Sequence, residues 1–173
     1  TFKADSLILK TIKKAPYQSK TSNSIETQYE MLKKLEVSKD QNVELNKYCL
    51  DNGITFLTTP FDDESLKDLD DLGLPAYKVA STDLTNIPFL IKIAKKAKPI
   101  ILSTGMSYLS EVKVALEAIY EHNKDVVLLQ CTANYPIKNN EANLAVLDTY
   151  KSNFDVLLGY SDHSDGVGAA PFA

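Results

Sequence analysis

The sequence predicts an α/β fold, an incomplete (β/α)₈ TIM barrel, and three observations support this. First, the short apolar run Ile100–Leu102 has no polar alternation, which is typical of a parallel strand buried on both faces. Second, similar runs begin 22 to 30 residues apart, the length of one βα unit. Third, each run ends in hydroxyl or ionisable side chains. The predicted strands are Ile54–Leu57, Ala76–Ala80, Ile100–Leu102, Val126–Leu129 and Val156–Leu158.

The position of the polar residues favours a barrel over a doubly wound open sheet, which remains the alternative. Both folds carry their chemistry at the carboxyl ends of the strands. Here nearly every predicted strand ends in such residues, rather than one pair at a single switch point. No Gly-x-Gly-x-x-Gly motif follows any strand, which argues against a dinucleotide site. Since 173 residues is well below the roughly 250 of a typical barrel, we expect residues 1–173 to form a partial barrel domain lacking strands at both ends.

Helical patterns alternate with the predicted strands. Ser38 is the expected N-cap of a helix that stops at Gly53, and the helix that starts near Ser110 carries a regular apolar face. The residues expected on that buried face are Val112, Val114, Leu116, Ala118 and Ile119. Thr21–Ser24 offers N-cap residues for an earlier helix that runs through Ile25 and Leu35. The remaining predicted helices are Asp63–Leu72, Phe89–Lys96, Leu144–Tyr150 and a last one within Asp165–Ala173.

Amino-acid composition limits which molecules the protein is expected to bind and which side chains can bind them. The net charge of −4 gives no bias towards polyanions, so we expect no nucleic-acid partner. No leader peptide or long apolar run is present, which predicts a soluble cytoplasmic protein with no membrane partner. Cys49 and Cys131 fit neither a zinc spacing nor a disulfide framework, and both are expected to be reduced and buried. The chain contains no arginine, so anions must be bound by lysine, hydroxyls or backbone N–H groups.

Lys78 is the one lysine inside an apolar strand pattern. It alternates with Tyr77 and Val79 and therefore points to the opposite face, into the lumen if the strand belongs to a barrel. Because an unpaired buried ammonium is costly, a function is expected. Lys78 could bind phosphate or carboxylate, or form a Schiff base. The structural alternative is a strand-end lysine that reaches solvent.

Four hydroxyl residues end the predicted strands. Each alone is most often a turn residue, but four of them around one lysine predict a cradle for an oxyanion such as phosphate. They are Thr59, Ser81, Ser103 and Ser161.

Other polar residues near the strand ends could have either a functional or a structural role. His163 could be a metal ligand or an acid/base group, or a surface turn histidine. Asp83 and Asp162 could be caps or acid/base groups. Tyr135, before a proline, could stack on a ligand or pack against the barrel rim.

Several motifs, in order along essentially the whole chain, resemble those of the sialic acid synthases (the N-acetylneuraminate synthase family). Together they are highly specific, and the Ser-Thr-Gly-Met and Gly-Tyr-Ser-Asp-His strings are strong singly. The matching stretches are Thr58–Asp62, Lys78–Asp83, Pro99–Met106, Cys131–Pro136 and Gly159–His163.

This resemblance implies a (β/α)₈ barrel followed by a small antifreeze-like domain, working as a domain-swapped homodimer. Family members condense phosphoenolpyruvate with an N-acetylated mannosamine-type amino sugar, giving a nonulosonic acid and phosphate, and they use Mn²⁺ or Mg²⁺. The resemblance implies that His163 is one of two metal-binding histidines, that Tyr135 lies in the sugar site, and that Asp83 stands where many members have glutamate. The positions that match phosphoenolpyruvate-binding residues are Thr59, Lys78, Ser81, Ser103 and Ser161.

Other parts of the family's site fall outside these residues, including the second metal histidine and the antifreeze-like domain. We therefore expect the 173-residue chain alone to be inactive. Three alternatives remain: a ketodeoxyoctonate-type synthase, a Schiff-base aldolase with Lys78 as nucleophile, and a non-catalytic barrel for assembly or carbohydrate binding. The first usually calls for arginine to bind a phosphorylated acceptor, and the chain has none.

Overall fold

The computed structural model describes residues 1–14, 18 and 26–173, which divide into two compact units, Thr1–Leu74 and Pro75–Ala173. Within the described residues, no helix is long and apolar enough to cross a bilayer.

The first unit is helical in its described part, and its capping follows the sequence. Ser38 caps α4 and accepts a hydrogen bond from the N–H of Gln41, while the Gln41 side chain returns one to the Ser38 backbone. Gly73 ends α5 in the left-handed region, at φ 76°. The predictions for these two helices are confirmed. The N-cap predicted at Thr21–Ser24 lies outside the described residues, and the helix observed next is capped by Thr27. The helices are α1 (Ala4–Leu7), α3 (Gln28–Lys33), α4 (Lys39–Asp51) and α5 (Asp63–Leu72).

The strand predicted over Ile54–Leu57 is wrong. These residues belong to no ladder in the described part of the chain, and the side chain of Ile54 is 60% exposed. Instead, the Thr1 nitrogen donates to the Thr59 carbonyl at 2.7 Å, and the Phe61 N–H donates to the Thr1 carbonyl at 3.1 Å. This is the bonding pattern of a parallel pair. Pairing therefore falls just after the apolar run, because a strand forms where a neighbour supplies its hydrogen bonds.

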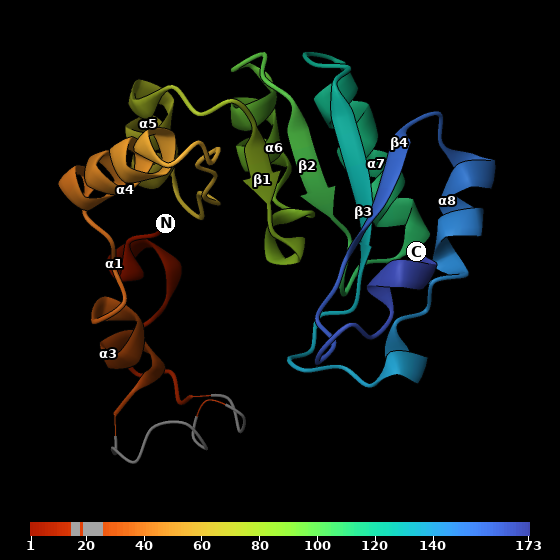
Figure 1. Cartoon of the computed structure of the whole chain (residues 1–173), viewed down its shortest axis with the longest axis horizontal. Helices are drawn as coiled ribbons and strands as arrows, with labels where there is room; N and C mark the ends of the chain where they lie inside the picture. Colours follow the sequence, from red (N-terminus) through yellow and green to blue (C-terminus); the bar gives the residue numbers. More distant parts are fainter. Residues whose placement is uncertain (15–17, 19–25) are drawn as a thin grey trace. The chain divides into compact units, whose positions relative to one another are not determined.

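The second unit contains a parallel sheet in the order β1-β2-β3-β4 (Figure 1). A helix follows each of the first three strands, as predicted. The strands are β1 (Tyr77–Val79), β2 (Ile100–Ser103), β3 (Val126–Cys131) and β4 (Leu157–Ser161). The helices are α6 (Ile87–Ala94), α7 (Leu109–Tyr120) and α8 (Val146–Asn153), with short 3₁₀ turns η1 (Ser81–Asp83), η2 (Asn139–Glu141) and η3 (Ala170–Phe172).

The helix predicted within Asp165–Ala173 is also wrong, since only the short turn η3 forms. Gly166 adopts φ 72°, which breaks a right-handed helix. Asp162 then accepts a hydrogen bond from the Ala170 N–H at 3.1 Å, which fixes the segment as a loop.

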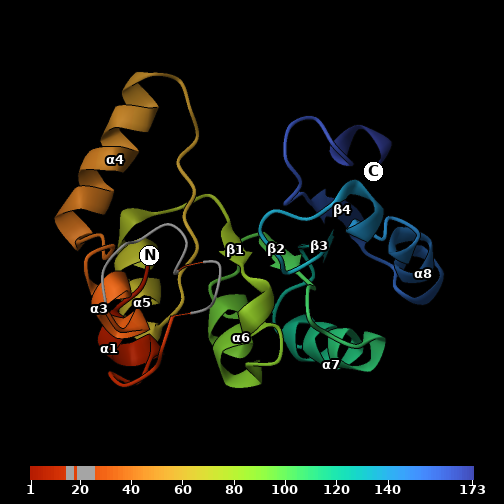
Figure 2. The same ribbon diagram turned by 90° about the horizontal axis from the view of Figure 1, so that it is seen from below.

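Helices α6 and α7 lie side by side on one face of the sheet (Figure 2). The core is formed by alternate strand residues, including Val79, Leu102 and Leu128, and by one face of each helix. Val114, predicted to be buried, is 52% exposed, whereas Val112, Ala115, Leu116 and Ile119 are buried. At 100° per residue, Val114 falls off the face that these four share.

The strand register places the polar residues on the other face. Val79, Leu102 and Leu128 form one cross-strand row that packs towards the helices. Lys78 and Ile101, one residue earlier, form the adjacent row, and side chains alternate between faces along a strand. Lys78 therefore points away from the helices, as predicted, which in an α/β barrel is the direction of the lumen.

Candidate functional site

The ends of β1 and β2 are linked by the Lys78 side chain. Its Nζ donates to the hydroxyl of Ser103 at 2.6 Å and to the carbonyl of Val79 at 3.0 Å. Burial lowers the pKa of Lys78, and the nearby Cys131 partly offsets this. Since Ser103 is two residues beyond the partner of Lys78, the two side chains share the face opposite the helices.

Ser81 joins the same strand ends through a backbone contact. The Gly105 N–H donates to the Ser81 hydroxyl at 2.9 Å. A Cβ at position 105 would lie 2.9 Å from that hydroxyl oxygen and 3.1 Å from Cβ of Ala133. Glycine is therefore needed here for close approach. The structure thus brings three predicted residues, Lys78, Ser81 and Ser103, to neighbouring strand ends.

His163 is held in a defined orientation. Its Nδ1 lies 2.8 Å from the Thr132 carbonyl, which can only accept, so we assign the proton of the neutral ring to Nδ1. The Nε2 atom then carries the lone pair and faces Sγ of Cys131 at 3.8 Å. The ring of Tyr135 stacks on the imidazole, with centroids 3.9 Å apart. Tyr135 thus packs against a predicted site residue.

The two aspartates differ in their surroundings. Burial raises the pKa of Asp83, which lies in η1 and receives a 3.4 Å hydrogen bond from Asn86 Nδ2 that acts in the opposite direction. Asp162 accepts the Ser164 N–H at 2.8 Å and the Ala170 N–H at 3.1 Å. The hydrogen bond from the Ser164 backbone N–H is the main reason that the pKa of Asp162 is lowered. These two bonds hold the loop that follows β4 against the Asp162 carboxylate.

Two further predicted residues belong to different units of the chain. Ser161 is the last residue of β4 and pairs with Cys131 in the ladder, so both face the same side as Ser103. Thr59 belongs to the first unit, where its carbonyl accepts the Thr1 nitrogen.

The sequence analysis missed a buried hydroxyl relay beside Ser103. The Tyr150 hydroxyl donates to Thr104 Oγ1 at 2.8 Å, and Thr104 Oγ1 donates to the Leu129 carbonyl at 2.9 Å. Thr104 could have been singled out, since it stands between Ser103 and Gly105. Tyr150 had no local signal, because it is 46 residues away in the chain. Cys131 is the last residue of β3. It is buried as predicted, whereas Cys49 is only partly buried.

His163 is well placed to bind a metal ion. Among residues 1–14, 18 and 26–173, no group of three or more histidine, cysteine or acidic side chains gathers around a common point. His163 does fit as one ligand, because its Nε2 is unprotonated in the assigned tautomer and its Nδ1 is fixed by a carbonyl.

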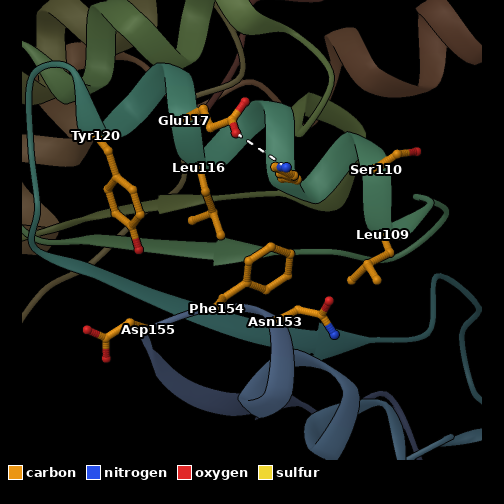
Figure 3. Close-up of a pocket in the computed structure, with 9 residues that line it drawn as sticks. Leu109, Ser110, Leu116, Glu117, Tyr120, Asn153, Phe154 and Asp155 are labelled. Atoms are coloured by element: carbon orange, nitrogen blue, oxygen red, sulfur yellow. Dashed lines mark ion pairs between the residues drawn. The ribbon is translucent and has the colours of Figure 1, made fainter.

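A pocket of about 530 Å³ lies elsewhere, between α7 and the end of α8 (Figure 3). Leu116 and Phe154 supply apolar surface, and Lys113 forms an ion pair with Glu117 on its wall at 3.9 Å. None of the predicted site residues lines it. We therefore place the candidate site at the strand ends, where the polar groups converge.

Comparison with known proteins identifies the family of the chain. Residues 1–173 match the model of the NeuB family. The chain is 41% identical over 172 residues to the N,N'-diacetyllegionaminic acid synthase of Legionella pneumophila and 43% identical over 170 residues to that of Campylobacter jejuni. These alignments cover 96% of this chain and 48% and 51% of the two relatives, so the chain spans about half their length. The crystal structure of the N-acetylneuraminic acid (sialic acid) synthetase of Leptospira borgpetersenii in complex with citrate superposes with a TM-score of 0.80 at 32% identity, covering 83% of this chain and 50% of that one.

The matched family model spans every residue of the sequence, and both synthases exceed 40% identity across nearly all of it. The four consecutive parallel strands also agree with the fold of the superposed synthetase. The chain belongs to the NeuB family.

Proposed function

We propose that the protein carrying this chain is a transferase that condenses phosphoenolpyruvate with an N-acetylated mannosamine-type sugar, giving a nonulosonic acid and phosphate. The main structural support is the Lys78 ammonium, half-buried and hydrogen-bonded to Ser103, with the Ser81 hydroxyl at the neighbouring strand end. Relatives at 41% and 43% identity bear the name of a synthase of such an acid.

These three side chains suit an anionic substrate. A lysine ammonium supplies a fixed positive charge, and hydroxyls add donors of adjustable direction. Held by them, phosphoenolpyruvate would present its C3 carbon to the sugar aldehyde at a fixed distance, which lowers the entropic part of the barrier. Ser161 ends β4 on the same face as Ser103 and is proposed to extend this cradle, and Thr59 is proposed as a further contact.

The other residues are assigned to the acceptor. Tyr135 is 60% exposed, so its ring edge and hydroxyl are proposed to contact the sugar while its face holds His163. Asp83 is proposed to bind a sugar hydroxyl or to transfer a proton, because burial raises its pKa towards the working range of a general acid. A divalent metal such as Mn²⁺ or Mg²⁺, held in part by His163, would supply Lewis-acid polarisation of the aldehyde.

We also propose that the complete protein is a cytoplasmic homodimer. The resemblance to the sialic acid synthases motivates the dimer. Light scattering coupled to size-exclusion chromatography of the complete gene product tests it, and a monomeric mass at micromolar concentration would contradict it.

Phosphate release tests the reaction. The complete gene product, loaded with Mn²⁺, is mixed with phosphoenolpyruvate and either N-acetylmannosamine or its 2,4-diacetamido-6-deoxy counterpart. Lys78→Ala is expected to lower kcat/KM about 100-fold or more, in the range seen when a charge-stabilising group is removed. Lys113→Ala, a change at an exposed lysine on α7, is the matched control. No release with either sugar, from a protein that binds phosphoenolpyruvate, would contradict the assignment of the acceptor.

A Schiff-base aldolase is the second candidate, and one observation favours it. Burial lowers the pKa of Lys78, which is how lysine nucleophiles are activated. Incubation with pyruvate and borohydride, followed by peptide mass spectrometry, separates the two reactions. A reduced adduct on Lys78 would support the aldolase, and its absence alongside phosphate release would exclude it.

A further inference from the structure

We propose that the Cys131 thiolate is a metal ligand that binds the same divalent ion as Nε2 of His163. The inference rests on the metal requirement of the proposed function and adds a ligand to it.

The distance between the two donor atoms suits a shared ion. Sγ of Cys131 and Nε2 of His163 are 3.8 Å apart, a distance at which the thiol donates a weak hydrogen bond to Nε2 and which an ion bound to both atoms would also span. A zinc-sized ion has metal–sulfur and metal–nitrogen bonds of about 2.3 and 2.0–2.1 Å. At tetrahedral or slightly wider angles, two such ligands lie roughly 3.6–3.8 Å from each other. The ion therefore fits between the two atoms with little movement of either side chain.

Both donors are fixed before any ion binds. Cys131 is the last residue of β3 and is 5% exposed, so its side chain has little freedom. The His163 ring is fixed by the hydrogen bond from Nδ1 to the Thr132 carbonyl, the outer contact that metal-binding histidines commonly make. Stacking of Tyr135 on the ring restricts its rotation. Such preorganisation reduces the entropy lost on binding.

Charge and donor type predict which ions the pair prefers. The nearby Lys78 ammonium opposes an added cation. A thiolate offsets one of the two charges of the ion, and its proton passes to solvent when the ion binds. Sulfur and imidazole donors suit Zn²⁺ or Co²⁺, whereas Mg²⁺ prefers oxygen. The site is thus expected to bind Co²⁺ and Zn²⁺ more tightly than Mg²⁺, with water, substrate oxygen or other side chains completing the coordination.

Cobalt titration tests the proposal on the complete gene product without phosphoenolpyruvate or sugar. Thiolate coordination gives a sulfur-to-Co²⁺ charge-transfer absorption, and calorimetry gives the affinity. The parent protein is expected to show this absorption. Cys131→Ser is expected to lose it and to bind Co²⁺ at least about tenfold more weakly, as is typical when a group that supports a metal is removed. Affinity for Mg²⁺ should change less.

Cys49→Ser is the matched control, since Cys49 is the second free cysteine and lies on α4. It should keep both the absorption and the affinity. No sulfur absorption in the parent protein would overturn the proposal even if Cys131→Ser fails to fold, as would equal Co²⁺ affinity in a folded Cys131→Ser. Because no substrate is present, this result is independent of whether phosphate release succeeds.

Discussion

The ammonium of Lys78 lies 2.6 Å from the hydroxyl of Ser103, so a side-chain hydrogen bond links the ends of β1 and β2 between residues 25 positions apart. Ser103→Ala removes the acceptor and leaves a half-buried charge with one fewer partner. We expect the free energy of unfolding to fall by about 1–3 kcal/mol. The KM for phosphoenolpyruvate should rise, with a smaller effect on the KM for the sugar. Urea unfolding and steady-state kinetics measure these quantities.

Ser110→Ala provides the control for this change, because Ser110 is an exposed serine at the start of α7. It should leave both quantities unchanged. Wild-type stability and kinetics in Ser103→Ala would show that the Lys78–Ser103 bond has no role in binding.

The hydrogen-bond relay from Tyr150 to Thr104 is expected to stabilise the fold. Tyr150→Phe removes the donor to Thr104 Oγ1 within a buried site but keeps the ring, so the free energy of unfolding should fall by about 0.5–1.5 kcal/mol. Tyr48→Phe, at a position that is 68% exposed, should change it by much less. A double-mutant cycle with Thr104→Val measures the coupling. Strict additivity of the two changes would contradict the relay.

Gly105→Ala tests the contact with Ser81. The added methyl would meet the Ser81 hydroxyl oxygen at 2.9 Å, so the loop or Ser81 must shift. We expect a loss of about 1–3 kcal/mol in unfolding free energy and weaker phosphoenolpyruvate binding. Since Ser81→Ala removes the atom in closest contact, the double variant should be less destabilised than the sum of the two single variants. Full additivity would indicate that the crowding arises elsewhere.

The loop from Asp162 to Ala170 should depend on pH. Hydrogen bonds lower the pKa of Asp162 below its ordinary value of 3.8, so the ionised carboxylate stabilises the folded loop above that pH. This contribution is lost as the pH falls through the lowered pKa. The amide proton shifts of Ser164 and Ala170 in NMR spectra should titrate together with a midpoint below 3.8.

Asp162→Asn supplies the comparison for that titration. The variant should lack the transition, because its side chain does not ionise in this range. A midpoint at or above 3.8 in the parent protein would contradict the two hydrogen bonds.

The sequence predicted those elements of the fold that depend only on neighbouring residues in the chain. The apolar runs of β2 and β3, the cap at Ser38 and the stop at Gly73 are set by burial, a side-chain acceptor and backbone freedom. The strand over Ile54–Leu57 failed because apolar character indicates burial, whereas a strand also requires a partner at the same residues.

The sequence predicted individual residues of the candidate site but not the contacts between them. Strand-end position identified Lys78, Ser81, Ser103 and His163, since parallel strands bring their carboxyl ends to one edge. It could not show that Tyr135 stacks on His163 or that Cys131 faces its Nε2, because these contacts join separate loops and strands.

Periodicity, turn residues and motif order are local properties of the chain, so they were enough to predict the barrel-type α/β class, the parallel strands of the second unit and the family. Three contacts depend on the assembled fold instead: the hydroxyl that accepts a hydrogen bond from the Lys78 ammonium, the tyrosine that donates to Thr104 and the thiol that faces His163. Each of these contacts joins residues 25 to 46 positions apart. Strand register and packing set such distances, and both arise only when the elements assemble.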